Sequence, residues 1–160
     1  MQMLYPYFWI FFGSMLPVLE LRGAIPVGIE RFHLPIFIVY ILAVFGCMLP
    51  ILIVLKVLGP ISDFLMKRVK FINKILTAIF DHTRKKYGSK MNKIGTALVL
   101  FIAIIPVPFI GGAWTAALIA FVFGIRYFRA VFFIFIGTII QGLIVLAGMY
   151  SFSAIWRMFF

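Results

Sequence analysis

Acidic residues are scarce in this sequence, and so are the side chains that usually build metal or catalytic sites. The chain of 160 residues contains only 4 Asp and Glu, 2 His and 1 Cys. A single cysteine, Cys47, cannot form a disulfide within the chain, and we expect it to pack in apolar surroundings. Two histidines without a cysteine cluster predict no metal site. No nucleophile–base pair or phosphate-cradling glycine loop is found, so we expect neither an enzyme nor a cofactor.

Apolar residues, by contrast, dominate the composition. Hydrophobic residues make up 65% of the chain, charged residues only 12%, and the mean hydropathy is +1.19. A soluble domain of this size could not bury so much apolar surface in one core. We therefore expect an all-α integral membrane protein with a single membrane domain, residues 1–160, that crosses the cell (cytoplasmic) membrane more than once. The N-terminus has no basic region and no small-residue cleavage site, so its apolar segment is expected to be retained.

Positive charge is concentrated in one segment. The net charge is +11, and nine of the 15 basic residues fall between Lys67 and Lys93. By the positive-inside rule, this pattern places the basic loop 59–93 in the cytoplasm. Binding of anionic lipid headgroups is the alternative explanation. Nucleic acid is not an expected partner, because no recognition module is present.

Four apolar blocks follow one another, at about 4–29, 35–58, 94–124 and 127–150. The second and fourth exceed the roughly 20 residues that a transmembrane helix needs. The first and third are interrupted, and their first arms of 13 and 12 residues would reach only about 18–20 Å. Such arms predict re-entrant helical hairpins, which enter a membrane and return to the same face. In the rival model both blocks span fully; the distribution of basic residues slightly favours the hairpins.

The interruptions are rich in proline and glycine. The first helix is expected to stop at Pro17 and restart near Gly23–Ala24, and the second to stop at Pro106 and restart near Gly112–Ala113. Four prolines are expected to mark the hairpin breaks: Pro17, Pro26, Pro106 and Pro108.

The two breaks also match each other in sequence. Pro-Val and Gly-Ala pairs recur at an offset of 89 residues, and Gly46 matches Gly137 at an offset of 91. Shared order and spacing predict an internal repeat, here two inverted repeats that each contain a hairpin followed by a transmembrane helix. Repeat one covers 4–58 and repeat two covers 94–150.

Between the repeats lies the connector 59–93. Apolar residues recur at three- and four-residue spacing over 60–80, with basic residues on another face. This pattern predicts an amphipathic helix on the inner membrane surface, whose role could be limited to joining the two halves.

The restart of each hairpin has the chemistry of an anion site. A helix start carries free N–H groups and partial positive charge. Glycines let a ligand approach the backbone closely, and Arg22 adds a forked donor suited to phosphate or carboxylate. Thr115 is expected to cap the restart or to contact substrate. The expected substrate-binding residues are Arg22, Gly23, Gly111, Gly112 and Thr115.

Glu20 is the acidic residue beside this positively charged site, two positions before Arg22. A carboxylate at membrane depth is costly unless it is paired, hydrated or protonated. We hypothesise that Glu20 couples transport to protons while Arg22 binds substrate. A structural Glu20–Arg22 salt bridge, or bonds to backbone carbonyls, remains an alternative, and it requires irregular backbone because residues two apart face different sides of a helix. Gln141, the only amide in a spanning block, is expected to hydrogen-bond across helices.

Two strings carry a family resemblance. The sequence "PVLELRGAIPVGI" at 17–29, followed by "PVPFIGGAWTAAL" at 106–118, resembles the small multidrug export protein family over nearly the whole chain. In the second string Phe109, Ile110 and Gly111 stand where that family typically has Gly, Thr and Gly. The pattern also resembles the wider DedA/VTT group of membrane proteins. That resemblance implies paired re-entrant hairpins and the movement of lipids, including polyprenyl phosphates in bacteria.

Carried over by motif, the resemblance makes Glu20 and Arg22 the functional pair. The expected function is translocation of an amphipathic or anionic lipid-like substrate, such as a polyprenyl phosphate, with proton coupling. A homodimer is expected, because two spans and two hairpins give a wet cavity little shielding. The first alternative is small multidrug efflux. The second is a non-transporting membrane scaffold or assembly factor, in which both charged residues are only structural.

Overall fold

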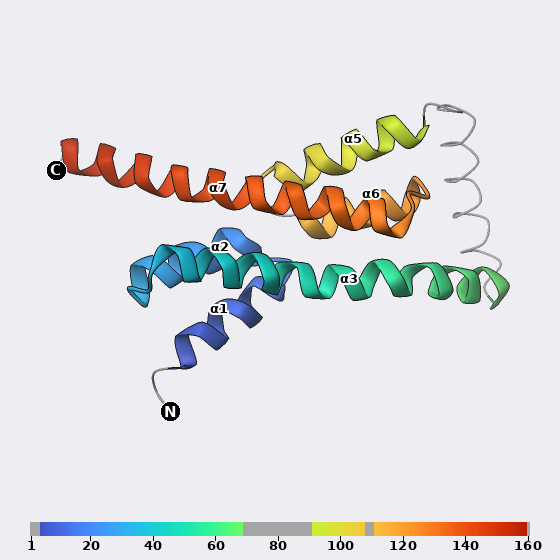
Figure 1. The fold of residues 1–160 in the computed structure, drawn as a ribbon, viewed down its shortest axis with the longest axis horizontal. Coiled ribbons are helices and arrows are strands. Elements are labelled where there is room, and N and C mark those ends of the chain that lie inside the picture. The colour runs from blue at the N-terminus through green and yellow to red at the C-terminus, as the bar shows by residue number, and fades with distance from the viewer. Residues whose placement is uncertain (1–3, 69–90, 108–110, 160) are drawn as a thin grey trace.

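The computed structural model describes residues 4–68, 91–107 and 111–159, and these residues form helices, turns and short connections without any strand (Figure 1). The helices are α1 (Tyr5–Met15), α2 (Glu20–Pro26), the π-helical segment η1 (Val27–Arg31), α3 (Ile36–Arg68), α5 (Met91–Ile104), α6 (Ala113–Val122) and α7 (Tyr127–Phe159).

The same arrangement occurs twice along the chain. In each half a short helix turns back into a second short helix, and a long helix follows (Figure 1). The hairpins α1–α2 and α5–α6 come from opposite ends of the molecule, and their turns meet near its middle, while α3 and α7 run antiparallel beside them. Helix α2 contacts α7 as well as α3, and α6 contacts α3 as well as α7. Each hairpin therefore packs against the long helices of both halves.

Proline chemistry explains the first turn. Helix α1 has Pro6 in its first turn, where the missing N–H costs nothing. It ends before Leu16, whose backbone is extended at φ −75° and ψ 134°. A residue before proline avoids the helical region, so Pro17 stops the helix at this point, as predicted. Helix α5 likewise ends at Ile104, two residues before Pro106.

The restart of the first hairpin differs from the prediction. Helix α2 begins at Glu20, not near Gly23, and Pro26 lies inside the helical run instead of breaking it. After the proline the chain widens into the π-helical segment η1, and Phe32 N–H bonds to Val27 O at 3.2 Å. The helical run therefore continues past Pro26, although the proline has no N–H to donate. The second restart is as expected, because α6 begins at Ala113.

The connector 59–93 also differs from the prediction in the part that the structure describes, residues 59–68 and 91–93. Helix α3 continues through Gly59 and Pro60 to Arg68, so no separate helix begins at residue 60. The rest of the expected amphipathic helix, most of the basic loop and Pro108 lie outside the described residues.

Among the residues that the structure describes, two helices have the length and composition needed to cross a membrane. They are Ile36–Leu58, with 23 residues, and Tyr127–Ser151, with 25 residues. By comparison, α1 has 11 residues and α6 has 10, which is half of the roughly 20 that a span requires. Neither the first nor the third block therefore forms one continuous helix.

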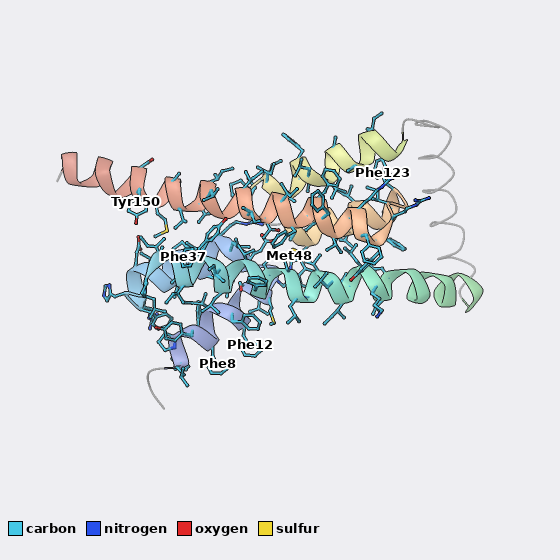
Figure 2. The ribbon with its side chains drawn as sticks, in the orientation of Figure 1. Phe8, Phe12, Phe37, Met48, Phe123 and Tyr150 are labelled. Atoms are coloured by element: carbon cyan, nitrogen blue, oxygen red, sulfur yellow. The ribbon has the colours of Figure 1, made fainter. Side chains whose placement is uncertain are left out.

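Aromatic side chains cover much of the outer surface of these helices. Phe8 and Phe12 stack on each other at 6.2 Å and point away from the bundle, whereas Met48 lies between α3 and α7 (Figure 2). Phe128 at the start of α7 is 84% exposed. Exposed phenylalanines at this density fit contact with hydrocarbon better than contact with water.

Small residues let the first arm of each hairpin lie directly against its long helix. A Cβ on Gly46 of α3 would collide with the carbonyl oxygen of Phe11 in α1, and a Cβ on Gly137 of α7 would collide with Ala103 in α5. The two glycines that match at an offset of 91 in the sequence therefore have the same packing role in the two halves. Close helix contacts through small residues are typical of membrane bundles.

Candidate functional site

Glu20 sits at the first turn of α2, where the two hairpin tips meet. Its backbone has φ +45°, a left-handed conformation that is rare for a residue with a side chain and costs about 1–2 kcal/mol. This irregular backbone turns the carboxylate inward, and the residue is only 1% exposed. A buried carboxylate is costly unless charged or polar partners surround it.

The first partner is Arg22 on the same helix. The Arg22 guanidinium donates to Glu20 Oε2 from Nη2 at 2.6 Å and from Nε at 3.2 Å. The same Nη2 donates to the carbonyl oxygen of Gly111 in the second hairpin at 3.0 Å. The salt bridge that was left open as an alternative is therefore present, and one guanidinium also links the two hairpins.

The second partner is the start of α6. The backbone N–H of Ala113, the first residue of that helix, donates to Glu20 Oε1 at 2.7 Å. The N-cap residue is Gly112, which has no side chain to satisfy the free N–H groups of the first turn. Glu20 from the other hairpin takes this capping role, and its negative charge lies at the positive end of the α6 dipole.

The long helices supply the remaining contacts. Gln141 on α7 donates from Nε2 to Glu20 Oε2 at 3.2 Å, as an amide expected to bond across helices. Cys47 on α3 places its sulfur 3.8 Å from Glu20 Oε1. We call these contacting residues, Glu20, Arg22, Cys47, Gly112, Ala113 and Gln141, the Glu20 cluster.

Every group of the cluster that contacts the carboxylate is a hydrogen-bond donor: guanidinium, backbone N–H, amide and thiol. An ionised carboxylate accepts only, so this donor set fits the charged form of Glu20. The donors come from α2, α3, α6 and α7. One side chain therefore joins both hairpins and both long helices at a single point.

Gly112 is required for this geometry. Its backbone has φ +99° and ψ 179°, a region that is essentially restricted to glycine. A Cβ at this position would lie 2.6 Å from Glu20 Oε1 and 2.6 Å from Arg22 Nη2. The close approach that was expected for a ligand is made by the protein's own ion pair.

Three buried polar atoms at or beside the cluster have no hydrogen-bond partner within the described structure. They are Arg22 Nη1, Gln141 Oε1 and Trp114 Nε1, the last one residue beyond Ala113. Buried polar groups normally find partners, and each unpaired one costs about 1–3 kcal/mol. The cluster thus retains two donors and one acceptor that a bound polar group could satisfy.

The other predicted site residues lie outside the cluster. Gly23 is inside α2 beside Leu19. Thr115 is half-buried on α6 and makes no hydrogen bond to the cluster. Pro17 and Pro106 are exposed in the two turns. The structure therefore brings together Glu20, Arg22, Gly111 and Gly112, but not Gly23 or Thr115.

The sequence did not identify two groups of the cluster. The N–H of Ala113 belongs to the backbone, and only the expected restart of the helix pointed to it. For Cys47 no signal other than its apolar surroundings was present. The prediction also placed a substrate anion at the start of α6, whereas Glu20 Oε1 fills that position. The sequence could not show this, because the two residues are 93 positions apart.

Comparison with known proteins gives one match. The model of the family described as "Putative small multi-drug export protein" matches residues 20–144, which include every residue of the Glu20 cluster. No curated protein and no solved structure matches the chain. An export family together with two apolar helices of spanning length identifies a membrane protein. Because the match covers more than half of the sequence, the chain belongs to the small multi-drug export protein family.

Proposed function

We propose that this protein transports an amphipathic, anionic, lipid-like substrate across the cell membrane, with the Glu20 cluster as the substrate site. In this proposal α1–α2 and α5–α6 are re-entrant hairpins of two inverted repeats, and their turns meet at the bilayer midplane. A polyprenyl phosphate is the model substrate. Transport of this kind requires no bond-forming chemistry, so the proposal assigns no enzymatic step to the protein.

The lengths of the hairpin arms support this placement. The 11 residues of α1 measure about 16 Å, close to half of the roughly 30 Å hydrocarbon core. The equivalent packing of Gly46 and Gly137 supports a repeat with opposite orientation, because α3 and α7 run antiparallel. Irregular backbone at membrane depth is tolerated where protein covers it. Glu20, directly after the first turn, and Gly111 and Gly112, at the end of the second, are buried, whereas Pro17 and Pro106 are exposed.

The observation that carries the proposal is that one buried carboxylate, that of Glu20, is bonded to groups of both halves. An anionic group entering the site would compete with Glu20 for the same donors, the Arg22 guanidinium and the Ala113 N–H. Releasing Glu20 from the second hairpin would remove its bonds to α6 and α7. The two halves could then move apart on one side, which is the step that alternating access needs.

Proton coupling follows from the same competition. A proton on Glu20 would remove the negative charge that Arg22 and the α6 N-terminus stabilise. Gln141 Oε1, unpaired in the present structure, could then accept a hydrogen bond from the carboxyl O–H after an amide flip. Protonation and substrate binding would both loosen the Glu20 cluster, and this links them thermodynamically.

Orientation and assembly complete the proposal. The basic loop 59–93 would lie in the cytoplasm, which places the open end of the first hairpin on the opposite face. A second copy of the chain would shield the site laterally, because two spans leave much of α3 and α7 exposed. Native mass spectrometry of the purified protein would show whether the dimer forms.

Efflux of small drugs is the second candidate, and the family description favours it. In that reading Glu20 would attract a cationic compound. The geometry favours an anion, because all four groups around the carboxylate are donors and Arg22 keeps one unpaired guanidinium nitrogen.

The test is transport by the purified protein in proteoliposomes. We expect a labelled polyprenyl phosphate to cross the bilayer faster than in protein-free vesicles, and a cationic dye to show no protein-dependent movement. Dye movement without lipid movement would replace the proposal with drug efflux. If neither compound moves, with or without a proton gradient, the protein acts as a scaffold and the proposal is wrong.

A further inference from the structure

A cavity lies at the open end of the first hairpin, at the opposite end of α1 from the Glu20 cluster. It has a volume of about 140 Å³ and is lined by Tyr5, Trp9, Val27, Arg31 and Phe32. One water needs roughly 10–15 Å³ by the same measure, so the cavity has room for a group of several non-hydrogen atoms. We call it the Arg31 cavity.

Three aromatic rings form its wall. Phe32 meets Tyr5 edge-to-face with ring centroids 6.3 Å apart, and it meets Trp9 in the same manner at 5.9 Å. These contacts fix the rings, so the cavity is preformed and little entropy is lost when a ligand enters. Tyrosine carries an O–H donor and tryptophan an N–H donor. Such side chains suit a ligand that has a polar group next to an apolar part.

The charge in the cavity is Arg31. It is exposed and makes no salt bridge among the described residues, although Glu30 precedes it in sequence. An arginine without a counter-charge attracts an anion, and its planar fork suits phosphate oxygens in particular. The same charge repels cations, so the aromatic wall is not a cage for a quaternary ammonium group.

The depth of the Arg31 cavity in the membrane indicates that a lipid phosphate is the source of that anion. If the turn of the first hairpin lies at the midplane, the start of α1 lies about 16 Å away, the length of an 11-residue helix. The half-thickness of the hydrocarbon core is about 15 Å, so the Arg31 cavity would open at the level of the lipid phosphates. Aromatic residues and arginine are the usual side chains at this depth.

We propose that the Arg31 cavity binds the phosphate group of an anionic lipid, in the leaflet opposite the basic loop. Arg31 receives the phosphate, the rings of Trp9 and Tyr5 pack beside the glycerol or prenyl carbons next to it, and η1 presents the arginine. The depth assignment rests on the proposed function, but the binding itself does not require that transport occur.

Native mass spectrometry tests this proposal with three probes: phosphatidylglycerol, phosphatidylcholine and inorganic phosphate. We expect the wild-type protein to retain phosphatidylglycerol more strongly than phosphatidylcholine. Arg31→Gln should weaken that binding by about tenfold, as expected for the loss of a charge-assisted hydrogen bond, and Trp9→Phe should weaken it less. Arg126→Gln, which removes an exposed arginine outside the cavity, should leave binding unchanged.

Two results would overturn the inference. If Arg126→Gln weakens the lipid as much as Arg31→Gln, binding reflects overall charge and not the cavity. If inorganic phosphate binds at Arg31 as well as phosphatidylglycerol does, the ligand is free phosphate and not a lipid. Glu20→Gln separates this proposal from the transport proposal, because it should abolish transport while phosphatidylglycerol still binds. Thermal unfolding of each variant checks that the fold is intact.

Discussion

Replacing Gly112 by alanine tests the structure of the Glu20 cluster most sharply. The backbone at Gly112 has φ +99° and ψ 179°, and a side chain in this region costs about 1–3 kcal/mol. The new Cβ would also lie 2.6 Å from Arg22 Nη2 and 2.6 Å from Glu20 Oε1, whereas ordinary contacts begin near 3.4 Å. The ion pair must therefore move, which weakens one or two charge-assisted bonds of about 1.5–3 kcal/mol each.

We accordingly expect Gly112→Ala to lower the free energy of unfolding by about 2.5–6 kcal/mol, adding the backbone cost to the loss of one charge-assisted bond. Gly124→Ala is the matched control. Gly124 also has a positive φ, +63°, but no atom lies within 4 Å of its Cβ position, so only a backbone cost of about 1–2 kcal/mol applies. Denaturant titration in detergent measures both variants. Equal losses in the two variants would refute the claim that the ion pair packs against Gly112.

Three further predictions concern the surroundings of the cluster. Gly46→Ala should destabilise the protein by about 1–3 kcal/mol through overpacking of α1 on α3, whereas Gly148→Ala, in open space, should not; thermal unfolding would reveal equal effects if the packing argument fails. Gln141→Leu should change the free energy of unfolding by less than about 2 kcal/mol, because it loses a bond to Glu20 but also removes an unpaired acceptor; a larger loss in denaturant titration would contradict this balance. Cys47 is fully buried, so a water-soluble maleimide should modify it slowly in the folded protein and fast after denaturation; rapid labelling of the folded protein, seen by mass spectrometry, would be inconsistent with the cluster.

Composition and proline placement predicted the coarse fold because they act locally. Apolar blocks longer than about 20 residues read directly as spans, and both spans are present in α3 and α7. Pro17 excludes the helical conformation at the residue before it, so the first turn was also predictable. The prediction for Pro26 was wrong, because the helical run continues past this proline into η1.

The site was predictable only in part, because only some of its features are encoded locally in the sequence. The charges of Glu20 and Arg22 stand out against an apolar background, and Gly112 marks a helix start. The contact between Glu20 and the start of α6 is long-range in sequence, because Glu20 and Ala113 lie in different hairpins. No local pattern encodes how the two hairpins are aligned with each other. The sequence therefore predicted an anion at the α6 N-terminus, but not that Glu20 itself provides it.

The central claim is that Glu20 is the group on which substrate and proton act. Its most direct test compares Glu20→Gln with Glu30→Gln in proteoliposomes, using a labelled polyprenyl phosphate. Both changes remove one negative charge from the same hairpin, but Glu20 is buried in the cluster and Glu30 is exposed. The account predicts that Glu20→Gln folds and stops transport, while Glu30→Gln transports as the wild type does. Equal transport by both variants would contradict it.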